Sequence, residues 1–279
     1  MSKDLLGREF EVYPAPQLLK QHGPATVIAM CNQKGGVGKT TSSINIASAL
    51  AFYGRRVLVV DFDPQGALTA GLGVNGNAVD VTIYTALFVS GFDIHEAVLR
   101  TAFENIDVIP ANIDLSAAEV QLVTEMGRER ILANALRPLL GEYDVVIIDC
   151  QPSLGLLTVN ALTAASGVII PVAAEFFALR GVALLMQSIE KVQTRINGSL
   201  RVFGVLPTMY THTLHSQEVL QRIYEAFGEK VFHSVISRSI KLPDSTVAAM
   251  PVTVFAPDHK VSKEYRAVAR EMIARGIVA

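Results

Sequence analysis

The sequence predicts an α/β fold in which a doubly wound, mostly parallel sheet is flanked by helices. Half of the 279 residues are hydrophobic, which is enough for a sizeable core. Short runs rich in Val and Ile alternate with stretches whose apolar residues recur at helical spacing, and this alternation is typical of parallel strands joined by right-handed helical crossovers. Runs such as 145–148 contain no alternating polar residues, as expected of strands covered on both faces.

The elements follow in order along the chain. Residues 1–25 are polar and contain three prolines, so we expect a leader that drapes over the domain or is disordered and carries no chemistry. Residues 26–279 contain no repeat or linker and are expected to form a single domain. Its first strand is expected at 27–30 and its first helix at 41–53. The other strands are expected at 57–61, 106–110, 145–149, 167–172, 202–206 and 231–236. A closing amphipathic helix is expected at 262–275, with an apolar side made of Tyr265, Val268, Ala269, Met272 and Ile273.

Composition argues against several classes of protein. The net charge is -2 and 18% of the residues are charged, which does not fit a globally cationic nucleic-acid-binding protein. No stretch approaches the roughly 20 apolar residues of a membrane span, and the first ten residues lack a signal-peptide core, so we expect a cytoplasmic protein without stable membrane insertion. Cys31 and Cys150 are too few for a disulfide framework or a four-thiolate metal site, and are expected to be buried packing residues. His212 and His215 have helical ligand spacing but no partner cluster, and are expected to lie on the surface.

The strongest chemical signal is a glycine-rich segment at 34–41, Lys-Gly-Gly-Val-Gly-Lys-Thr-Thr, between the first strand and the first helix. Such a turn directs backbone N–H groups into a concavity, and the helix N-terminus adds its positive end, so the segment can bind a triphosphate. This predicts a fold of the P-loop NTPase type. Lys39 would reach the β- and γ-phosphates, Thr40 would place its hydroxyl on Mg²⁺, and Thr41 would help to hold the α-phosphate. The loop backbone would come from Gly35, Gly36, Val37 and Gly38.

Two of the predicted strands end in carboxylates. The strand at 57–61 leads into Asp61, Asp63 and a Pro-Gln-Gly turn, and the strand at 145–149 ends in Asp149. Ligands bind at the carboxyl ends of parallel strands, where a carboxylate can order a Mg²⁺-bound or attacking water. We expect Asp149 to hold Mg²⁺ through water and to be followed by a segment that senses the γ-phosphate. From the strand pattern alone, Asp63 could equally be a helix cap.

Residues 32–41 resemble the deviant Walker A loop of the ParA/MinD family of dimeric ATPases, because Gln33 replaces the usual first glycine and a second lysine, Lys34, begins the loop. Further similarity at 61–66, 113–119, 175–181 and 208–210 fits the chromosome- or plasmid-partitioning ParA (Soj) proteins better than MinD or the nitrogenase iron protein. The resemblance implies an ATPase that uses ATP and Mg²⁺ and is slow alone. It implies that Lys34 reaches across a nucleotide-sandwich homodimer, that Asp63 is the hydrolysis residue beside Mg²⁺, and that Met209 contacts the nucleotide.

The resemblance also implies non-specific DNA binding by the ATP-bound dimer, stimulation of hydrolysis by a ParB-type partner, and association with the nucleoid. At 211–216 this chain lacks the arginine that the family uses on DNA, whereas Arg238 and Lys241 supply a second basic position. Residues 191–279 contain twelve Lys and Arg against seven Asp and Glu, an excess that fits weak phosphate-backbone binding and an ordinary solvated surface equally well.

Two other functions stay open. One is a ParA-like or MinD-like positioning ATPase at the division site or membrane with little DNA binding. The other is a metabolic ligase or kinase, which would need a substrate pocket that the sequence does not reveal. The helix at 262–275 is expected to pack in the core and not to bind a membrane, because it has no exposed Trp or Phe.

Overall fold

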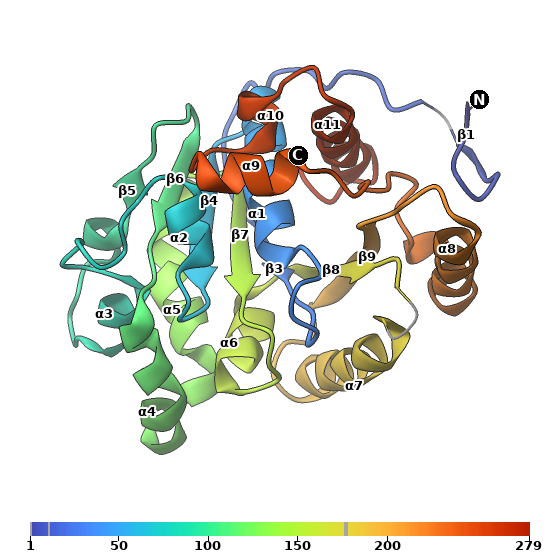
Figure 1. The fold of residues 1–279 in the computed structure, drawn as a ribbon. Helices are drawn as coiled ribbons and strands as arrows, with labels where there is room; N and C mark the ends of the chain where they lie inside the picture. Colours follow the sequence, from blue (N-terminus) through green and yellow to red (C-terminus); the bar gives the residue numbers. More distant parts are fainter. Residues whose placement is uncertain (1, 11, 176–177) are drawn as a thin grey trace.

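The computed structural model describes residues 2–10, 12–175 and 178–279. A seven-stranded sheet of order β5-β6-β4-β7-β3-β8-β9 forms its centre (Figure 1). The strands are β3 (Thr26–Met30), β4 (Val57–Phe62), β5 (Leu99–Arg100), β6 (Ile106–Ile109), β7 (Val145–Cys150), β8 (Gly167–Ala173) and β9 (Arg201–Thr208). Every pair is parallel except β5 with β6, which confirms the predicted fold class. The strand order reverses beside β3, so the loop that follows β3 lies where ligands bind in such sheets.

Helices cover both faces of the sheet, as its apolar strands require. One face packs against α1 (Lys39–Phe52), α2 (Ala67–Gly71), α10 (Val252–Phe255) and α11 (Lys260–Ala274). The other packs against α3 (Ile83–Phe88), α4 (Ala118–Thr124), α5 (Ile131–Leu136), α6 (Leu156–Ala164), α7 (Ala178–Arg195) and α8 (Leu214–Phe227). Helix α9 (Lys241–Val247) and the 3-10 turns at Ile94–Ala97, Ile113–Ala117, Arg128–Arg130, Arg137–Gly141 and Gly228–Lys230 complete the chain. Alternate residues of β7 belong to the two cores, Val146 to one and Ile147 to the other.

Helix α11 confirms the predicted closing helix and lies against α1. Tyr265, Val268, Ala269 and Met272 are buried, and the Tyr265 hydroxyl lies 3.3 Å from Ser42 Oγ. Its apolar side is therefore part of the core, as expected. Within the described residues, no helix combines the length and the apolar content that crossing a membrane would need.

One strand expectation was wrong, and one short strand of the sheet was missed. Residues 231–236 form no strand and make one isolated bridge, Val231 with Val205. Phe232 N and Ile236 N donate to β9, but side chains take up the backbone groups between them, and this prevents a continuous ladder. Glu271 accepts hydrogen bonds from His233 N at 2.7 Å and Ser234 N at 2.8 Å, and Arg8 donates to the carbonyl oxygens of Val231 and Phe232. The antiparallel strand β5, two residues long, was missed because it is too short to show a pattern.

The Glu271 carboxylate provides a test of this segment. It is fully buried and also accepts a hydrogen bond from Arg275 Nη2 at 2.5 Å. Replacing Glu271 by alanine is expected to lower the free energy of unfolding by about 3–5 kcal/mol. The change leaves two backbone N–H groups without an acceptor and the Arg275 guanidinium without its carboxylate partner. Urea unfolding monitored by circular dichroism would measure this loss. A cost below about 1 kcal/mol would show that water replaces the carboxylate readily.

The described part of the leader lies against the domain. A hairpin of β1 (Ser2–Lys3) and β2 (Glu9–Phe10) is located beside α8 (Figure 1), where Arg8 stacks on Tyr224 at 4.8 Å. Asp4 accepts hydrogen bonds from Arg8 and lies 2.9 Å from His233 Nδ1. Burial alone would raise the pKa of Asp4, but the hydrogen bonds from His233 and Arg8 outweigh it and lower the pKa. Further along, His22 and the backbone of Gly23 bond to Asp144.

Candidate functional site

The glycine-rich loop joins β3 to α1 at the carboxyl edge of the sheet. Gly36 and Gly38 have φ values of 71° and 85°, a region that favours glycine. A Cβ added at Gly35 or Gly36 would meet no atom within 4 Å, so the space over the loop is open. Gly38 is the N-cap residue of α1, so the positive end of the helix dipole lies at this loop. The first turn of α1 carries no acidic residue that would neutralise it. The loop therefore has the shape and the electrostatics of an anion cradle.

Asn32 and Thr208 hold this loop in place by hydrogen bonds, and neither was expected to have a role. Asn32 is buried, donates from Nδ2 to Pro171 O at 2.7 Å, and accepts from Lys34 N at 2.9 Å through Oδ1. Thr208, at the end of β9, donates to Val37 O at 2.8 Å. Asn32 lies inside the motif that carries the family resemblance, but nothing in the sequence indicates that its partner is Pro171. These bonds hold the loop on the neighbouring strands before any ligand binds.

Lys39 lies beneath the loop. Its side chain is buried, and Nζ donates to Lys34 O at 3.3 Å. Among the described residues Lys39 has no ion-pair partner within 4 Å, and burial lowers its pKa although Asp149 opposes this shift. A buried ammonium without a counter-ion is costly, and a phosphate in the cradle would remove that cost. The environment of Lys39 therefore fits an anionic ligand.

Asp149 ends β7 beside the loop. It is buried, and Oδ1 accepts a hydrogen bond from Ser43 Oγ at 2.8 Å. Oδ2 has no hydrogen-bond partner among the described residues, and the nearby Thr40 hydroxyl favours the charged carboxylate, which lowers its pKa. Burial, followed by the charge of Asp61, raises the pKa of Asp149 to about 7. An unpaired carboxylate oxygen beside a threonine hydroxyl offers the oxygen ligands that suit Mg²⁺ or its bound water.

No group of three or more His, Cys, Asp or Glu able to hold a metal occurs in the part of the chain that the structure describes. His212 and His215 are exposed, as expected, and His212 Nε2 lies 3.1 Å from Lys260 Nζ. Mg²⁺ is commonly bound by one or two protein oxygens together with phosphates and water. The pairing of Thr40 with Asp149 therefore fits a metal that arrives with a nucleotide, and does not fit a permanent metal centre.

The two aspartates at the end of β4 differ in environment. Asp61 is fully buried and accepts hydrogen bonds from Thr69 N at 2.8 Å and Thr69 Oγ1 at 2.6 Å. Burial raises the pKa of Asp61 to about 6. Thr69 Oγ1 in turn accepts from Ala111 N at 3.0 Å, which ties the turn to the end of β6. Asp63 is only partly buried, and its Oδ1 accepts from Gln65 N at 3.0 Å. Asp61 is thus a structural residue, and Asp63 caps its own turn.

The first lysine of the loop, Lys34, is engaged within its own chain. Its Nζ lies 2.8 Å from Glu175 Oε2, both side chains are partly exposed, and Lys34 lowers the pKa of Glu175. The segment 175–181, part of the family resemblance, includes Phe176 and Phe177, which lie outside the described residues. In the single chain, Lys34 is therefore held beside the loop by an acidic residue.

Replacing Glu175 by glutamine tests this pairing. If Lys34 must leave Glu175 to reach a second chain, the variant is expected to dimerise with ATP up to about fivefold more tightly, since an exposed ion pair is worth at most about 1 kcal/mol. Sedimentation of wild type and variant over a range of concentrations would measure the change. Weaker dimerisation of the variant would indicate that Glu175 itself takes part in the interface.

A cavity of about 750 Å³ adjoins the loop. Gly38, Thr41, Thr208 and Met209 line one side, and Ile236, Ile240, Leu242 and Val247 give it apolar walls. Its volume lies in the range of small-ligand sites, and its walls suit an adenosine group. Thr41 and Met209, both predicted to bind nucleotide, thus lie together. Arg238, predicted to bind DNA, also lines this cavity, whereas Lys241 lies 3.3 Å from Asp244 Oδ2.

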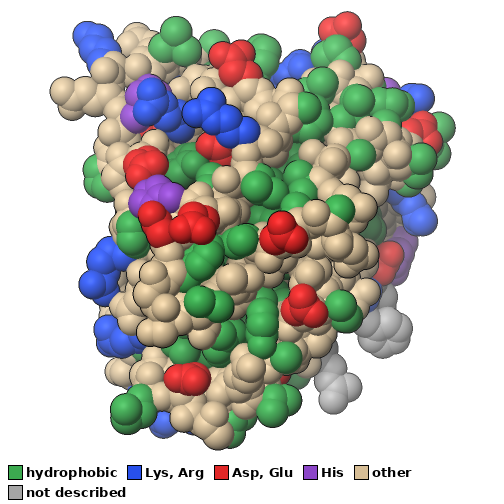
Figure 2. Space-filling view, turned by 90° about the vertical axis from the view of Figure 1, so that its left-hand side faces the viewer, with side chains coloured by type: hydrophobic (Ala, Val, Ile, Leu, Met, Phe, Trp, Pro, Cys, Tyr) green, Lys and Arg blue, Asp and Glu red, His purple; other side chains and the backbone are tan. Residues whose placement is uncertain are grey.

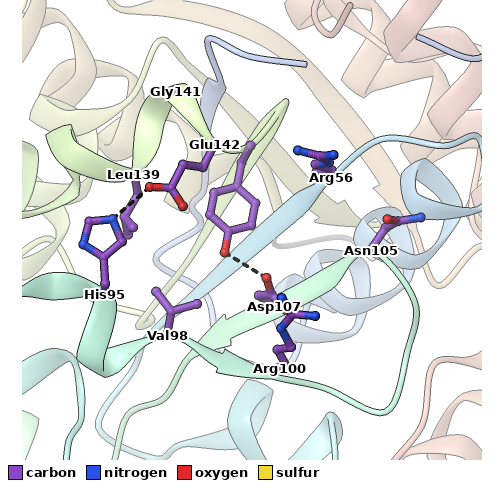
Figure 3. A pocket seen from close by; sticks show the side chains of 10 residues that line it. Arg56, His95, Val98, Arg100, Asn105, Asp107, Leu139, Gly141 and Glu142 are labelled. Carbon is purple, nitrogen blue, oxygen red and sulfur yellow. Dashed lines mark hydrogen bonds and ion pairs between the residues drawn. The ribbon is translucent and has the colours of Figure 1, made fainter. Parts of the chain in front are cut away.

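A second cavity of about 750 Å³ lies at the opposite, amino edge of the sheet (Figure 3). His95 lies 2.8 Å from Glu142 Oε1 and the Tyr143 hydroxyl donates to Asp107 at 2.8 Å, and Arg56 and Arg100 also line this cavity. Its described lining contains no glycine loop or long-helix N-terminus, so we place the phosphate site at the carboxyl edge.

Figure 2 shows the side of the molecule around β5 and α4, where charges of both signs are mixed and form no large basic field.

Comparison with known proteins decides the family. A family model described as an AAA domain matches residues 25–202. Sporulation initiation inhibitor protein Soj of Bacillus subtilis is 42% identical over 251 residues, covering 90% of this chain and 99% of Soj. Chromosome partitioning protein ParA of Caulobacter vibrioides is 41% identical over 255 residues, covering 90% and 95%. The chain belongs to the ParA/Soj family. The expected family resemblance is therefore confirmed.

Two further matches extend the comparison for this ParA/Soj chain. An uncharacterized protein of Mycobacterium tuberculosis is 53% identical over 272 residues, covering 97% of this chain and 86% of that protein. Among solved structures, cobyrinic acid a,c-diamide synthase from Mycobacterium smegmatis with bound ADP and magnesium is 40% identical, with a TM-score of 0.78 and coverage of 88% and 92%. Relatives with 40% identity or more thus carry different names.

Proposed function

We propose that this chain is a ParA-type ATPase whose ATP-dependent dimerisation and non-specific DNA binding, reset by partner-stimulated hydrolysis, drive segregation of a chromosome or plasmid. The observation that carries the proposal is the pair of lysines around one open cradle. Lys39 is buried beneath the cradle without a counter-ion among the described residues. Lys34 lies beside the cradle and forms a partly exposed ion pair with Glu175. The partitioning names of relatives that match almost their full length support this assignment.

In the proposed complex, ATP would place its phosphates on residues 35–41 and its adenosine in the adjoining cavity with Met209. Mg²⁺ would be held by Thr40 and, through water, by Asp149, where it would neutralise the charge that develops on the phosphates. The unpaired Asp149 oxygen and the open space over Gly35 support this arrangement. The relative solved with bound ADP and magnesium also supports it.

Hydrolysis would need two chains. Asp63 would orient the attacking water, and Lys34 of one chain would reach the phosphates held by the other, as an arginine finger does. In the single chain Lys34 is paired with Glu175, so the site is incomplete and turnover alone would be slow. A ParB-type partner would accelerate this step. The segments after Asp63 and Asp149 would then relax and the homodimer would separate.

DNA binding in this proposal depends on dimerisation. Arg238 is exposed, and Lys241 is partly buried beside Asp244, so one chain offers only a weak cationic site. Two such sites in one dimer would act together and gain affinity without any new contact. Binding to the phosphate backbone would fall steeply with salt. The protein would then be cytoplasmic and associated with the nucleoid.

The test is sedimentation with random-sequence DNA at two salt concentrations, with and without ATP. The double variant Arg238→Ala/Lys241→Ala is expected to lose ATP-dependent binding. A matched control, Arg56→Ala/Arg100→Ala, removes the same charge at the amino edge of the sheet and is expected to bind as wild type does. A wild-type protein that dimerises with ATP but never binds DNA would overturn the partitioning proposal.

One observation favours a positioning ATPase with little DNA binding. Residues 211–216 carry no arginine, and their hydroxyl groups bond to one another. Thr211 Oγ1 lies 2.8 Å from Ser216 Oγ, and Thr213 caps α8 by accepting from Ser216 N at 3.3 Å. The segment therefore serves as a helix cap. Sedimentation with anionic liposomes distinguishes this alternative, because only a membrane-directed ATPase would bind them with ATP.

The synthase name of the 40% identical structure calls for one further control. The cavity beside the loop has apolar walls, and Arg238 is its only basic lining residue among those described. Such a lining suits a nucleoside better than a large polycarboxylic acid. We therefore expect cobyrinic acid to leave ATP turnover unchanged. A stimulation by this acid would favour the metabolic ligase.

A further inference from the structure

Helix α4 carries a carboxylate that reaches the segment following Asp149. Glu119 Oε1 accepts a hydrogen bond from Gln151 Nε2 at 2.8 Å, and Oε2 accepts from Leu156 N at 3.0 Å. Helix α6 begins at Leu156, and its N-cap residue Gly155 supplies no side-chain cap. The carboxylate of another helix thus caps α6, close to the positive end of that helix.

The fit around this carboxylate is tight. A Cβ added at Gly155 would lie 2.3 Å from Glu119 Oε1 and 2.8 Å from Oε2, so only glycine leaves room for it. Gln151 is two residues beyond Asp149, and its side-chain amide donates to Glu119 at 2.8 Å. The segment 151–156 is therefore held from outside by α4.

The same part of the chain also touches the other carboxylate segment. Ala111, before α4, donates from its backbone N to Thr69 Oγ1 at 3.0 Å, and Thr69 bonds to Asp61 at 2.6 Å. The stretch from 111 to 119 thus contacts α2, which follows the turn that carries Asp63, at one end and the segment after Asp149 at the other. The segments that follow the two carboxylate-bearing strands β4 and β7 thus share one connecting element.

We propose that Glu119 is a positioning residue for ATP hydrolysis, which holds the segment after Asp149 in register with the turn that carries Asp63. The inference rests on the proposed ATPase function. Glu119 touches no nucleotide group directly and acts through Gln151 and the start of α6. Its loss leaves the phosphate cradle intact and lets the segment drift from its place, so it lowers turnover and not nucleotide affinity.

The main test is Glu119→Ala, measured as kcat under saturating ATP and as the Kd of a fluorescent ATP analogue. We expect kcat to fall about tenfold to a hundredfold, as for a displacement of about 1 Å at a reacting group, with Kd within about twofold of wild type. Gly155→Ala, which pushes on the same carboxylate from α6, should show the same split. Wild-type kcat in Glu119→Ala would overturn the inference.

A matched control separates positioning from loss of stability. Asn160→Ala also weakens α6, because Asn160 donates to Arg128 O at 2.8 Å and Leu156 O at 3.0 Å, but it leaves Gln151 untouched. It is expected to lower Tm with little effect on kcat. An equal loss of kcat in Asn160→Ala would mean that Glu119 acts only by stabilising α6.

An exchange of the two partners tests the bond itself. In the double variant Glu119→Gln/Gln151→Glu, an amide on α4 faces a carboxylate at 151, so the hydrogen bond is restored with its direction reversed. We expect kcat to recover by severalfold over Gln151→Glu alone, in which two carboxylates face each other and neither can donate. A double variant no faster than the single one would contradict a direct role of this bond. The failure of the proposed function looks different: wild type itself would then fail to hydrolyse ATP even as a dimer. The positioning role of Glu119 fails when wild type hydrolyses ATP and Glu119→Ala does so equally fast.

Discussion

Replacing Lys34 by alanine is expected to leave nucleotide binding by the single chain intact and to abolish ATP-dependent dimerisation. The Lys34 side chain bonds to Glu175, whereas only its backbone oxygen contacts Lys39, so the phosphate cradle should survive the change. Turnover should fall by about 10³-fold or more, the range known for a cationic group supplied by a second chain. Light scattering after size exclusion and a phosphate-release assay would measure the two effects.

Mixing variants shows whether Lys34 acts on its own nucleotide or on that of a second chain. Lys34→Ala retains its Lys39, and Lys39→Ala retains its Lys34, so a mixed dimer contains one complete site if Lys34 acts across the interface. We expect each variant alone to be inactive and the mixture to recover part of the wild-type rate. Lys3→Ala, which removes only an exposed ion pair with Glu9 at 3.8 Å, serves as the control. A mixture as inactive as its components would show that Lys34 acts within its own chain.

The sequence was sufficient for the parts of the fold that local pattern controls. Apolar runs such as 145–148 became strands covered on both faces, and the apolar side of α11 packs on α1. Cys31 and Cys150 are buried, as expected, with their sulfur atoms 3.1 Å apart at the ends of β3 and β7. Each of these outcomes depends on hydrophobic burial at a period that can be read directly from the chain.

The sequence was insufficient where a long-range side chain replaces a backbone partner. Residues 231–236 have the composition of a strand, but Glu271 and Arg8 take up their backbone groups from 38 and 224 residues away. Asn32 and Glu119 lie inside recognised motifs, yet their partners Pro171 and Gln151 are chosen by the packing of strands and helices. Composition carries no information about such pairs, because any buried polar group needs some partner and the fold decides which.

Replacing Asp149 by asparagine is expected to stabilise the nucleotide-free protein and to remove its response to Mg²⁺. Asp149 is buried, one of its oxygens is unpaired among the described residues, and burial and Asp61 raise its pKa to about 7. An aspartate in the unfolded chain has a pKa of about 3.9. Between about pH 4 and pH 7, the folded chain therefore holds a proton on Asp149 that the unfolded chain has lost. By linkage, this group makes the folded state less stable as the pH rises from about 4 to about 7.

Asparagine keeps an oxygen that can accept the Ser43 hydroxyl but carries no charge to bury. The difference in Tm between variant and wild type should therefore grow from pH 5 to pH 8 in the absence of nucleotide, as differential scanning fluorimetry would show. With ADP and Mg²⁺ the wild type should have the higher Tm, because the bound ion neutralises the Asp149 carboxylate. The variant has no carboxylate there and should bind Mg²⁺ about 10–100-fold more weakly. A variant that is less stable than wild type at pH 8 without ligand would mean that the carboxylate is already compensated in the free chain. The carboxylate would then serve the structure around Ser43, and the metal would have to be placed elsewhere.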